Sequence, residues 1–485
     1  MDALPSPNPM RIDAATQAVG LASAFTMPAD QVLHQFFRSR RDLGPLDRAF
    51  AAEVMYAVLR RWRTLNARAS MPGPASPTST SATTSATTAT ATTTTTAAAT
   101  RAATPIDAST FAGADGTASA AHPAAAGSVD ARAPTPRRLV LVALTSVFGL
   151  SARALEAAIG RNDSEWLAAT HALDASTLSP ATLLDIPDWL YDRMCARFGA
   201  TETATLIGAL NQPAPLDLRI NPAKIDRAGA VAQFAARRIE ARLTPYSPFG
   251  LRIAGRPTLG RDPLYEDGAI EVQDEGSQLL AQLVAPKRRE MIVDFCAGAG
   301  GKTLALGALM QSTGRLYAFD VSAKRLKAFE PRLKRSGLSN VHPQLLSNES
   351  DARVKRLAGK IDRVLVDAPC TGLGTLRRNP DMKWRQPESA VAEMAAKQSA
   401  ILASAARLLK PGGRIVYATC SLLDEENRAV VEAFLAANPA FTLCPANEVL
   451  AGLGIALDTG PYLELLPHRH GTDGFFAAVL ERAKA

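Results

Sequence analysis

The second half of the chain repeats a short apolar run followed by a longer stretch in which apolar residues recur at helical spacing. Each run is rich in Val, Ile, Leu or Phe. The runs are Met291–Phe295, Arg315–Asp320, Val341–Leu346, Ile361–Val366, Arg414–Ala418 and Gly474–Leu480. This alternation predicts an α/β fold in which a mostly parallel sheet carries helices on both faces.

The first third of the chain has a helical pattern that is interrupted once. Apolar residues at helical spacing mark Leu46–Leu65, and further on Leu139–Phe148 and Ala152–Ile159. Residues 71–136 between them are almost entirely Ala, Thr, Ser and Pro. Such a segment buries too little apolar surface to offset the entropy of ordering it, so we expect a disordered insert. The pattern predicts one helical domain over residues 1–170, interrupted by that insert.

Between these two parts the pattern is mixed. Ile186–Phe198 is typical of a helix, Leu216–Asn221 alternates as a strand does, and Glu271–Gln278 leads into another helix. We therefore expect a small α+β region at residues 171–287 and a separate α/β domain at residues 288–485.

Charge, apolar content and cysteine spacing limit the classes of protein to which the chain can belong. The net charge of +8 is compatible with a polyanionic partner, and no apolar run approaches the ~20 residues that cross a bilayer. The start of the chain lacks the basic and apolar stretches of a signal peptide, so we expect a cytoplasmic protein. An odd number of cysteines without C-x-x-C spacing argues against a disulfide framework or a zinc site. The cysteines are Cys195, Cys296, Cys370, Cys420 and Cys444.

A glycine-rich turn joins the first strand of the second half to a helix. It is not a P-loop, because Cys296 stands where that motif requires glycine, and Thr303 occupies the third position of the dinucleotide fingerprint. What remains is a loop whose backbone can approach a ligand closely. The next strand ends in Asp320, a carboxylate placed to accept hydrogen bonds from ribose hydroxyls.

Two thiols follow two later strands. Cys370 comes after Ile361–Val366 in the sequence Asp367-Ala-Pro-Cys, and Cys420 comes after Arg414–Ala418 in Thr-Cys-Ser. Open α/β sheets carry their chemistry at the carboxyl ends of the strands. The pattern therefore predicts two thiols facing a nucleotide-like cofactor.

Together these motifs resemble the RsmB/NOP family of S-adenosylmethionine-dependent RNA cytosine-5 methyltransferases. The resemblance covers about the last 300 residues, and the region around Ala49–Leu65 is more loosely similar to the NusB-like RNA-binding domain of the RsmB branch. The segments that carry it are Phe295–Thr303, Asp367–Cys370, Tyr417–Ser421, Glu425–Asn427 and Asp473–Phe476, with Trp189-Leu190, Leu218–Asn221 and Val272–Asp274 upstream. It implies a Rossmann-like class I methyltransferase sheet in which the fourth strand lies beside the first and the fifth beside the fourth.

The resemblance also implies roles. Cys420 would attack carbon 6 of cytosine, and Cys370 would assist release of the methylated product. The cofactor would be S-adenosylmethionine, held by Cys296, Ala297, Gly298, Ala299, Gly300, Gly301, Lys302, Asp320 and Asp367. Lys302 and Asp367 are alternatively placed to contact the target base. The acidic residue that usually contacts the adenine side has no clear counterpart in Ser347–Asp351.

The expected partner is RNA, ribosomal rather than transfer RNA, with no metal and no membrane, and the protein is expected to act as a monomer. Basic residues after the Pro-Cys motif, together with Trp384, were candidates for gripping RNA phosphates: Arg377, Arg378, Lys383 and Arg385. Alternatives remain open at this stage: a transfer-RNA methyltransferase, a DNA cytosine-5 methyltransferase that uses the Pro-Cys thiol, and an RNA-binding assembly factor without catalysis. The turn reads Ala-Gly-Ala-Gly-Gly rather than the family's usual Ala-Ala-Pro-Gly-Gly, so it assigns no specificity group.

Overall fold

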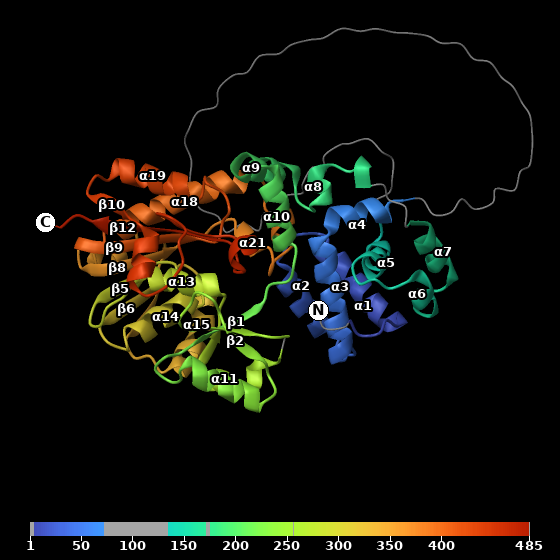
Figure 1. The fold of residues 1–485 in the computed structure, drawn as a ribbon, viewed down its shortest axis with the longest axis horizontal. Helices are drawn as coiled ribbons and strands as arrows, with labels where there is room; N and C mark the ends of the chain where they lie inside the picture. Colours follow the sequence, from blue (N-terminus) through green and yellow to red (C-terminus); the bar gives the residue numbers. More distant parts are fainter. Residues whose placement is uncertain (1–3, 72–133, 171–174, 256, 485) are drawn as a thin grey trace, which may run out of the picture.

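The computed structural model describes residues 4–71, 134–170, 175–255 and 257–484. Three regions lie along the long axis of the molecule: a helical region on the right of Figure 1, a small sheet in its lower middle, and a large sheet on the left. The insert expected at 71–136 falls, apart from its ends, outside the described residues. The proposed boundaries between the domains stay predictions.

The large sheet confirms the predicted α/β fold. Its strands lie in the order β10-β12-β9-β8-β5-β6-β7, with β11 beside β12, and the neighbours from β9 to β7 are parallel. As expected, the fourth strand of the α/β repeat, β8, lies next to the first, β5, and the fifth, β9, lies next to β8. The strands are β5 (Met291–Asp294), β6 (Arg315–Asp320), β7 (Val341–Leu345), β8 (Ile361–Asp367), β9 (Leu409–Thr419), β10 (Phe441–Cys444), β11 (Leu463–Leu465) and β12 (Phe475–Arg482).

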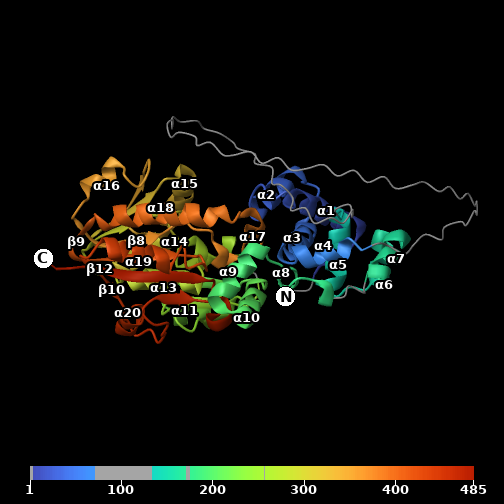
Figure 2. The ribbon, with the colours of Figure 1, turned by 90° about the horizontal axis from the view of Figure 1, so that it is seen from above.

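Helices cover both faces of this sheet, as the layered view in Figure 2 shows. One apolar core joins the sheet to α13 and α14, and a second core on the opposite face joins it to α18 and α19. The helices are α13 (Glu275–Val284), α14 (Gly301–Leu309), α15 (Ala323–Ser336), α16 (Ala352–Arg356), α17 (Met382–Arg385), α18 (Ser389–Ala406), α19 (Arg428–Ala437), α20 (Ala446–Gly452) and α21 (Pro467–His470), with a 3₁₀ turn at Leu373–Thr375.

The small sheet is antiparallel, in the order β2-β3-β1-β4, and has its own apolar core. Its last strand, β4, runs directly into Asp274, the N-cap of α13, which carries the chain into the large sheet. The elements are α8 (Pro180–Leu183), α9 (Asp188–Phe198), α10 (Ala200–Leu210), β1 (Leu216–Ile220), α11 (Arg227–Ala236), β2 (Ala241–Leu243), β3 (Gly250–Ile253), α12 (Pro263–Glu266) and β4 (Ile270–Val272), with 3₁₀ turns at Ala175–Thr177 and Leu259–Arg261.

The helical region is a bundle around a single apolar core. The one helix expected at Leu46–Leu65 is two helices, because the backbone leaves the helical conformation at Arg61, with φ −112° and ψ 33°. The sequence pattern did not identify the helices α1, α2 and α7. The helices are α1 (Pro9–Ala22), α2 (Ala29–Ser39), α3 (Pro45–Arg60), α4 (Trp62–Ala69), α5 (Pro136–Ser146), α6 (Ala152–Ile159) and α7 (Arg161–Ala169).

The helical region is fastened to the loop that follows Cys370. Trp384 Nε1 donates to the carbonyl of Leu59 at 2.8 Å, and Lys383 Nζ donates to the carbonyl of Arg60 at 3.1 Å. Lys383 is fully buried, which lowers its pKa to about 7. The expectation that Lys383 and Trp384 grip RNA phosphates is therefore wrong, because both side chains are used inside the protein, at the junction of its regions.

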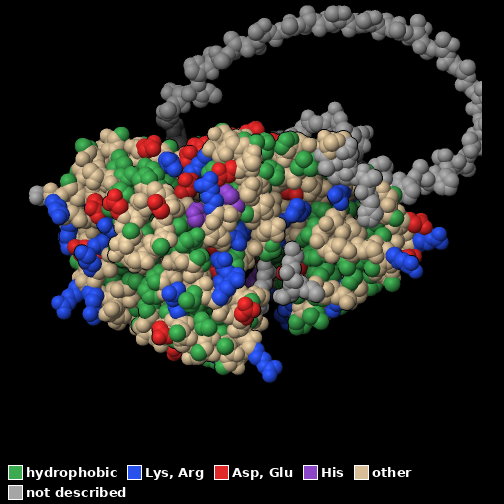
Figure 3. Space-filling model, viewed as in Figure 1, with side chains coloured by type: hydrophobic (Ala, Val, Ile, Leu, Met, Phe, Trp, Pro, Cys, Tyr) green, Lys and Arg blue, Asp and Glu red, His purple; other side chains and the backbone are tan. Residues whose placement is uncertain are grey.

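In the described part of the chain, no helix has the length and apolar character needed to cross a membrane. The same residues contain no group of three or more His, Cys, Asp or Glu side chains arranged to hold a metal ion. Lys and Arg side chains on the face drawn in Figure 3 are interspersed with acidic ones and do not gather into one band.

Candidate active site

A cavity of about 960 Å³ opens at the carboxyl ends of β5, β6, β7 and β8. Its position agrees with the rule that open α/β sheets bind ligands beyond these strand ends. Most of the residues singled out in the sequence line it: Cys296, Ala297, Gly298, Ala299, Gly301, Lys302, Asp320, Asp367 and Cys370. Gly300 and Cys420 do not line it directly.

The β6 end of the cavity is organised by Asp320. The Asp320 side chain is almost fully buried, and its two oxygens accept hydrogen bonds from the backbone N–H of Gly298 (2.8 Å) and of Ser322 (2.7 Å). A carboxylate oxygen has two lone pairs, so each oxygen keeps capacity for a further donor. The carboxylate is thus fixed in place while it still faces the cavity.

The glycines of the turn have two different functions. Gly298 has φ +55°, and a Cβ added there would meet no atom within 4 Å, so its backbone borders open cavity. Gly300 has φ +80°, and a Cβ there would lie 2.0 Å from the ring of Phe329. Gly300 is therefore required for packing α14 against α15. Its expected contact with the cofactor is not supported by its position.

The loop after β7 contains two acidic residues, Glu349 and Asp351, which have different positions and roles. Asp351 caps α16: its oxygens accept from the backbone N–H of Arg353 (2.8 Å) and of Ser347 (2.9 Å), which lowers its pKa to about 2. Asn348 and Glu349 line the cavity instead. With Ser347, which also lines the cavity, they are the polar residues of this loop that a bound nucleoside would meet.

The two thiols lie side by side. The Sγ atoms of Cys370 and Cys420 are 3.4 Å apart, because β8 and β9 are adjacent parallel strands and each thiol follows its strand. The hydrogen bond with Cys420, together with burial, raises the pKa of Cys370 well above its usual value. Cys370 therefore remains a thiol at neutral pH and can donate its S–H to the sulfur of Cys420.

The buried carboxylate of Glu426 holds the two loops that carry Cys370 and Cys420. Glu426 has no exposed surface, and it accepts hydrogen bonds from the backbone N–H of Thr371 (2.8 Å), from Gln398 Nε2 (3.0 Å) and from the hydroxyls of Thr371 and Ser421. Thr371 follows Cys370 and Ser421 follows Cys420. One side chain thus fixes the spacing of the two sulfurs. Glu425–Asn427 is one of the segments that carry the family resemblance, but the sequence alone indicates no role for Glu426.

Lys302 connects the glycine turn to the thiol strand. Its Nζ is 2.7 Å from Asp367 Oδ2. Burial disfavours the charge on Lys302, but the adjacent Asp367, with Cys420 also nearby, outweighs burial and raises the pKa of the lysine. Lys302 is therefore a fixed cation close to the sulfur of Cys420.

Asp294, at the end of β5, is a site residue that the sequence analysis missed. It lines the cavity, and its Oδ2 accepts a hydrogen bond from Thr303 Oγ1 at 2.7 Å, whereas the buried Oδ1 has no hydrogen-bond partner. Burial, reinforced by nearby Asp367, raises its pKa to about 7. The signal was present in the sequence as an acidic residue within an otherwise apolar strand.

Comparison with known proteins identifies the family. Residues 281–481 match the model described as 16S rRNA methyltransferase RsmB/F, and residues 186–258 match the ferredoxin-like domain of RsmF/B-like methyltransferases. A probable ribosomal RNA small subunit methyltransferase B from Synechocystis is 35% identical over 322 residues, which are 64% of this chain and 70% of the relative. Its counterpart from Bacillus subtilis is 31% identical over 313 residues, 62% of this chain and 67% of the relative. The chain belongs to the RsmB/F methyltransferase family.

Solved structures agree with this assignment. A methyltransferase homolog protein from Pyrococcus horikoshii superimposes with a TM-score of 0.55 at 27% sequence identity, over 64% of this chain and all of that one. The family recognised from the sequence motifs and the Rossmann-like sheet are both confirmed. The NusB-like character of the helical region stays a prediction.

The cavity of this RsmB/F-family chain fits S-adenosylmethionine. Gly298 leaves open space beside the turn, Asp320 offers carboxylate oxygens that could accept from ribose hydroxyls, and the unpartnered Oδ1 of Asp294 offers a buried acceptor. The thiol of Cys296 is buried, which raises its pKa well above the usual value, so it lines the cavity as an uncharged group. A cationic, ribose-containing ligand suits this set of acceptors.

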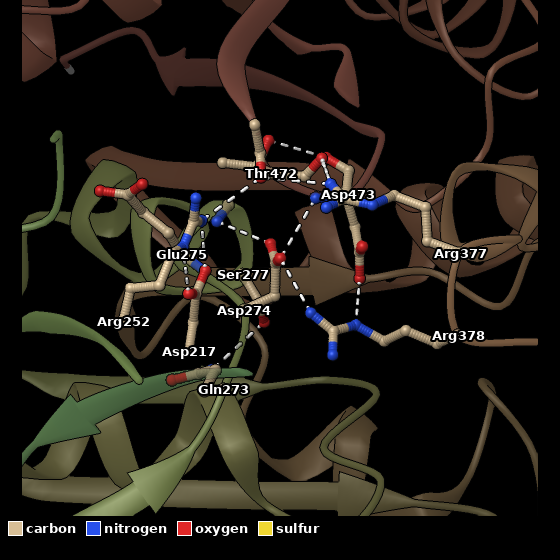
Figure 4. A network of polar contacts seen from close by, with 12 residues as sticks. Asp217, Arg252, Gln273, Asp274, Glu275, Ser277, Arg377, Arg378, Thr472 and Asp473 are labelled. Atoms are coloured by element: carbon tan, nitrogen blue, oxygen red, sulfur yellow. Dashed lines mark hydrogen bonds and ion pairs between the residues drawn. The ribbon is translucent and has the colours of Figure 1, made fainter. Parts of the chain in front are cut away.

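A second polar network lies beside the cavity, where the small sheet meets the C-terminal loop (Figure 4). Arg378 is held between two carboxylates, with its Nε 2.5 Å from Asp473 Oδ2 and its Nη2 3.1 Å from Asp274 Oδ2. Arg377 Nη1 donates to the carbonyls of Gly471 and Thr472. Arg378 lines the cavity and is about one-third exposed, whereas Arg377 is buried. The network fixes both arginines relative to Cys370.

Proposed function

We propose that the protein transfers a methyl group from S-adenosylmethionine to carbon 5 of a cytosine in small-subunit ribosomal RNA, through a covalent bond between Cys420 and carbon 6. The observation that carries the proposal is the pair of sulfurs 3.4 Å apart beside a cofactor-sized cavity. The relatives named above supply the class of RNA.

Two sulfurs suit this reaction because carbon 5 of cytosine is a weak nucleophile. Addition of the Cys420 thiolate to carbon 6 moves the electrons of the 5,6 double bond to carbon 5, which can then accept a methyl group. Bound S-adenosylmethionine supplies an electrophilic methyl group on a sulfonium. A base at the site then takes the carbon 5 proton, and the electrons of that C–H bond restore the 5,6 double bond as the Cys420 thiolate leaves carbon 6.

The surrounding residues support these steps. Lys302 provides a cation near the sulfur of Cys420, and the Cys370 thiol lies within hydrogen-bond distance of that sulfur. Asp367, which the ion pair with Lys302 holds at the cavity, is placed to accept a hydrogen bond from the amino group of the base. Cys370 would assist when the product leaves Cys420.

The test is analysis of the product. A small-subunit ribosomal RNA transcript is incubated with the protein and S-adenosylmethionine, digested to nucleosides and examined by mass spectrometry. We expect 5-methylcytidine with the wild-type protein and none with Cys420→Ala, and bisulfite sequencing would locate the position. Methylation of another atom or base, or undiminished product from Cys420→Ala, would contradict the proposal. A transfer-RNA transcript methylated in preference to ribosomal RNA would change the substrate class.

A further inference from the structure

A second, smaller cleft lies between the helical region and the active-site loop. It has a volume of about 390 Å³. Tyr56 and Arg60 of α3 line one side, and Arg377 and Arg378 line another; the remaining lining is the segment 214–216, which leads into β1. We call it the junction cleft. It lies outside the cofactor cavity but shares one residue with it, because Arg378 lines both.

The lining of the junction cleft has the chemistry of a nucleotide site. It offers one aromatic ring, three guanidinium groups and a half-buried apolar floor of Ala214, Pro215 and Leu216, and it contains no carboxylate. Single-stranded RNA is bound by stacking of bases on aromatic side chains or guanidinium planes, combined with cations that contact the phosphates. The Arg60 guanidinium already lies 5.7 Å from the centre of the Tyr56 ring, so the two groups act as one surface.

The walls of the junction cleft are fixed relative to the thiols. Arg60 Nη2 donates to the carbonyl of Arg377 at 3.1 Å, and the Trp384 and Lys383 contacts described above tie the end of α3 to the same loop. Arg378 is held by Asp274 and Asp473 (Figure 4). A ligand in the junction cleft would thus meet preformed groups at a constant position relative to Cys370.

We propose that the junction cleft binds the nucleotide next to the target cytosine, with its base on the Tyr56 ring and its phosphate at the arginines, Arg60 among them. The inference rests on the proposed RNA substrate. Arg378 lines both the cofactor cavity and the junction cleft, so an RNA strand whose target base enters the cavity passes Arg378 and reaches the cleft. The helical region then contributes directly to choosing the sequence around the target. Arg60 and Tyr56 are specificity-determining residues on this account.

The experiment measures RNA binding rather than methyl transfer. A fluorescein-labelled single-stranded oligocytidylate of ten nucleotides is titrated with the full chain at several KCl concentrations, and fluorescence anisotropy gives the Kd. We expect Tyr56→Ala to bind about tenfold more weakly, because stacking of one base on an aromatic ring is lost, and Tyr56→Phe to bind nearly as the wild type does. Arg60→Gln should lower the slope of log affinity against log salt by about 0.7, the contribution of one phosphate on a single strand.

The matched control is Arg153→Gln, which removes one exposed arginine from α6, on the helical region but away from the junction cleft. It should leave the Kd close to that of the wild type, and thermal melting would verify that each variant folds. If Tyr56→Ala does not fold, the salt slope of Arg60→Gln still decides the matter.

Wild-type affinity in a folded Tyr56→Ala variant together with a wild-type salt slope in Arg60→Gln, or no binding of the probe by the wild-type chain, would overturn the assignment. Because methylation is not measured, the two proposals fail separately. Weakened binding by the variants alongside a wild-type chain that makes no 5-methylcytidine would support the cleft and reject the chemistry. Wild-type binding by Tyr56→Ala and Arg60→Gln, together with formation of 5-methylcytidine by the wild-type chain, would reject the cleft and support the chemistry.

Discussion

The two ends of the cofactor cavity are built in different ways. At the β6 end, Asp320 is held by backbone N–H groups from its own loop and from the adjacent glycine turn. At the thiol end, Cys370 and Cys420 depend on Glu426, which gathers hydrogen bonds from both thiol loops and from Gln398 of α18. The β6 end therefore follows from short local motifs. The thiol end is assembled from side chains that are distant in the sequence.

This difference predicts how the two ends respond to substitution. Changes at the β6 end should mainly alter cofactor affinity, because the Asp320 carboxylate is proposed to contact the ribose of the cofactor. Changes behind the thiols should mainly alter kcat, because they move reacting groups without removing any contact to the cofactor.

The largest effect is expected from Glu426→Ala. It leaves the Thr371 N–H and the hydroxyls of Thr371 and Ser421 without their acceptor, so the two sulfurs lose their common support. A displacement of about 1 Å in a reacting group costs on the order of 10²-fold in rate. We expect kcat for RNA methylation to fall about 100-fold, with the Kd for S-adenosylmethionine, measured by calorimetry, within a few-fold of the wild type.

The neighbouring Glu425 supplies the control. Its side chain is exposed and pairs with Arg193 on the surface, so Glu425→Ala should leave kcat nearly unchanged. Equal losses in the Glu425 and Glu426 variants would show that position along the chain, rather than burial behind the thiols, determines the effect.

The second effect, on the Kd for S-adenosylmethionine rather than on kcat, is expected from Asp320→Ala. The loss of a hydrogen bond to a charged group costs about 1.5–3 kcal/mol, so the Kd for S-adenosylmethionine should rise roughly 10- to 150-fold. Activity at saturating cofactor should recover most of the wild-type kcat. Asp362→Ala is the matched control: this aspartate lies near the start of β8, at the opposite edge of the sheet, and pairs with Lys410. If cofactor affinity were unchanged in Asp320→Ala, the ribose contact would have to lie elsewhere.

The smallest effect concerns the dependence of cofactor binding on pH. Asp294 has a pKa of about 7 in the folded protein because it is buried. As the pH rises from 6 to 8 it ionises and places a negative charge at the cavity. A cationic sulfonium ligand should therefore bind more tightly at pH 8, and Asp294→Asn should flatten that dependence. An unchanged pH profile in Asp294→Asn would remove this carboxylate from cofactor binding.

The pH dependence of the free energy of unfolding gives an independent test of the pKa of Asp294. The folded protein binds this proton up to a pH of about 7, whereas the unfolded chain releases it near pH 4. The contribution of Asp294 to the free energy of unfolding is therefore present in full below about pH 4 and is lost as the pH rises to about 7. Denaturant titrations at pH 5 and pH 8 should show this loss in the wild type and a smaller one in Asp294→Asn.

The difference between the two ends of the cavity also explains which site residues could be predicted from the sequence. The strand ends, the glycine turn, Asp320 and both thiols were identified because each lies in a short segment with a local pattern. Asp294 received no role, although it stands as an acidic residue within an apolar strand. Glu426 received none either, since only burial against distant residues distinguishes it from an ordinary acidic residue. Lys383 and Trp384 were misread as an RNA grip for the same reason: a basic, aromatic segment has the same sequence whether it faces solvent or packs against another region.

The length of β9 illustrates a further limit. The strand was expected at Arg414–Ala418, but it begins at Leu409 and includes Pro411 and two glycines. Leu409 pairs with Ile361, and the register then shifts before Arg414 pairs with Arg363. Pairing with β8 therefore overrides residues that, read alone, indicate a turn.

The central claim is that the two thiols, although 3.4 Å apart, have different functions. Denaturing electrophoresis of the RNA-incubated Cys420→Ala and Cys370→Ala variants tests it most directly. Without its nucleophile, Cys420→Ala should give neither product nor a protein–RNA adduct. Cys370→Ala should still attack and methylate, then accumulate as an adduct that survives denaturation because release is impaired. An adduct in Cys420→Ala but not in Cys370→Ala would reverse the roles, and adducts in neither variant with activity retained would remove both thiols from the chemistry.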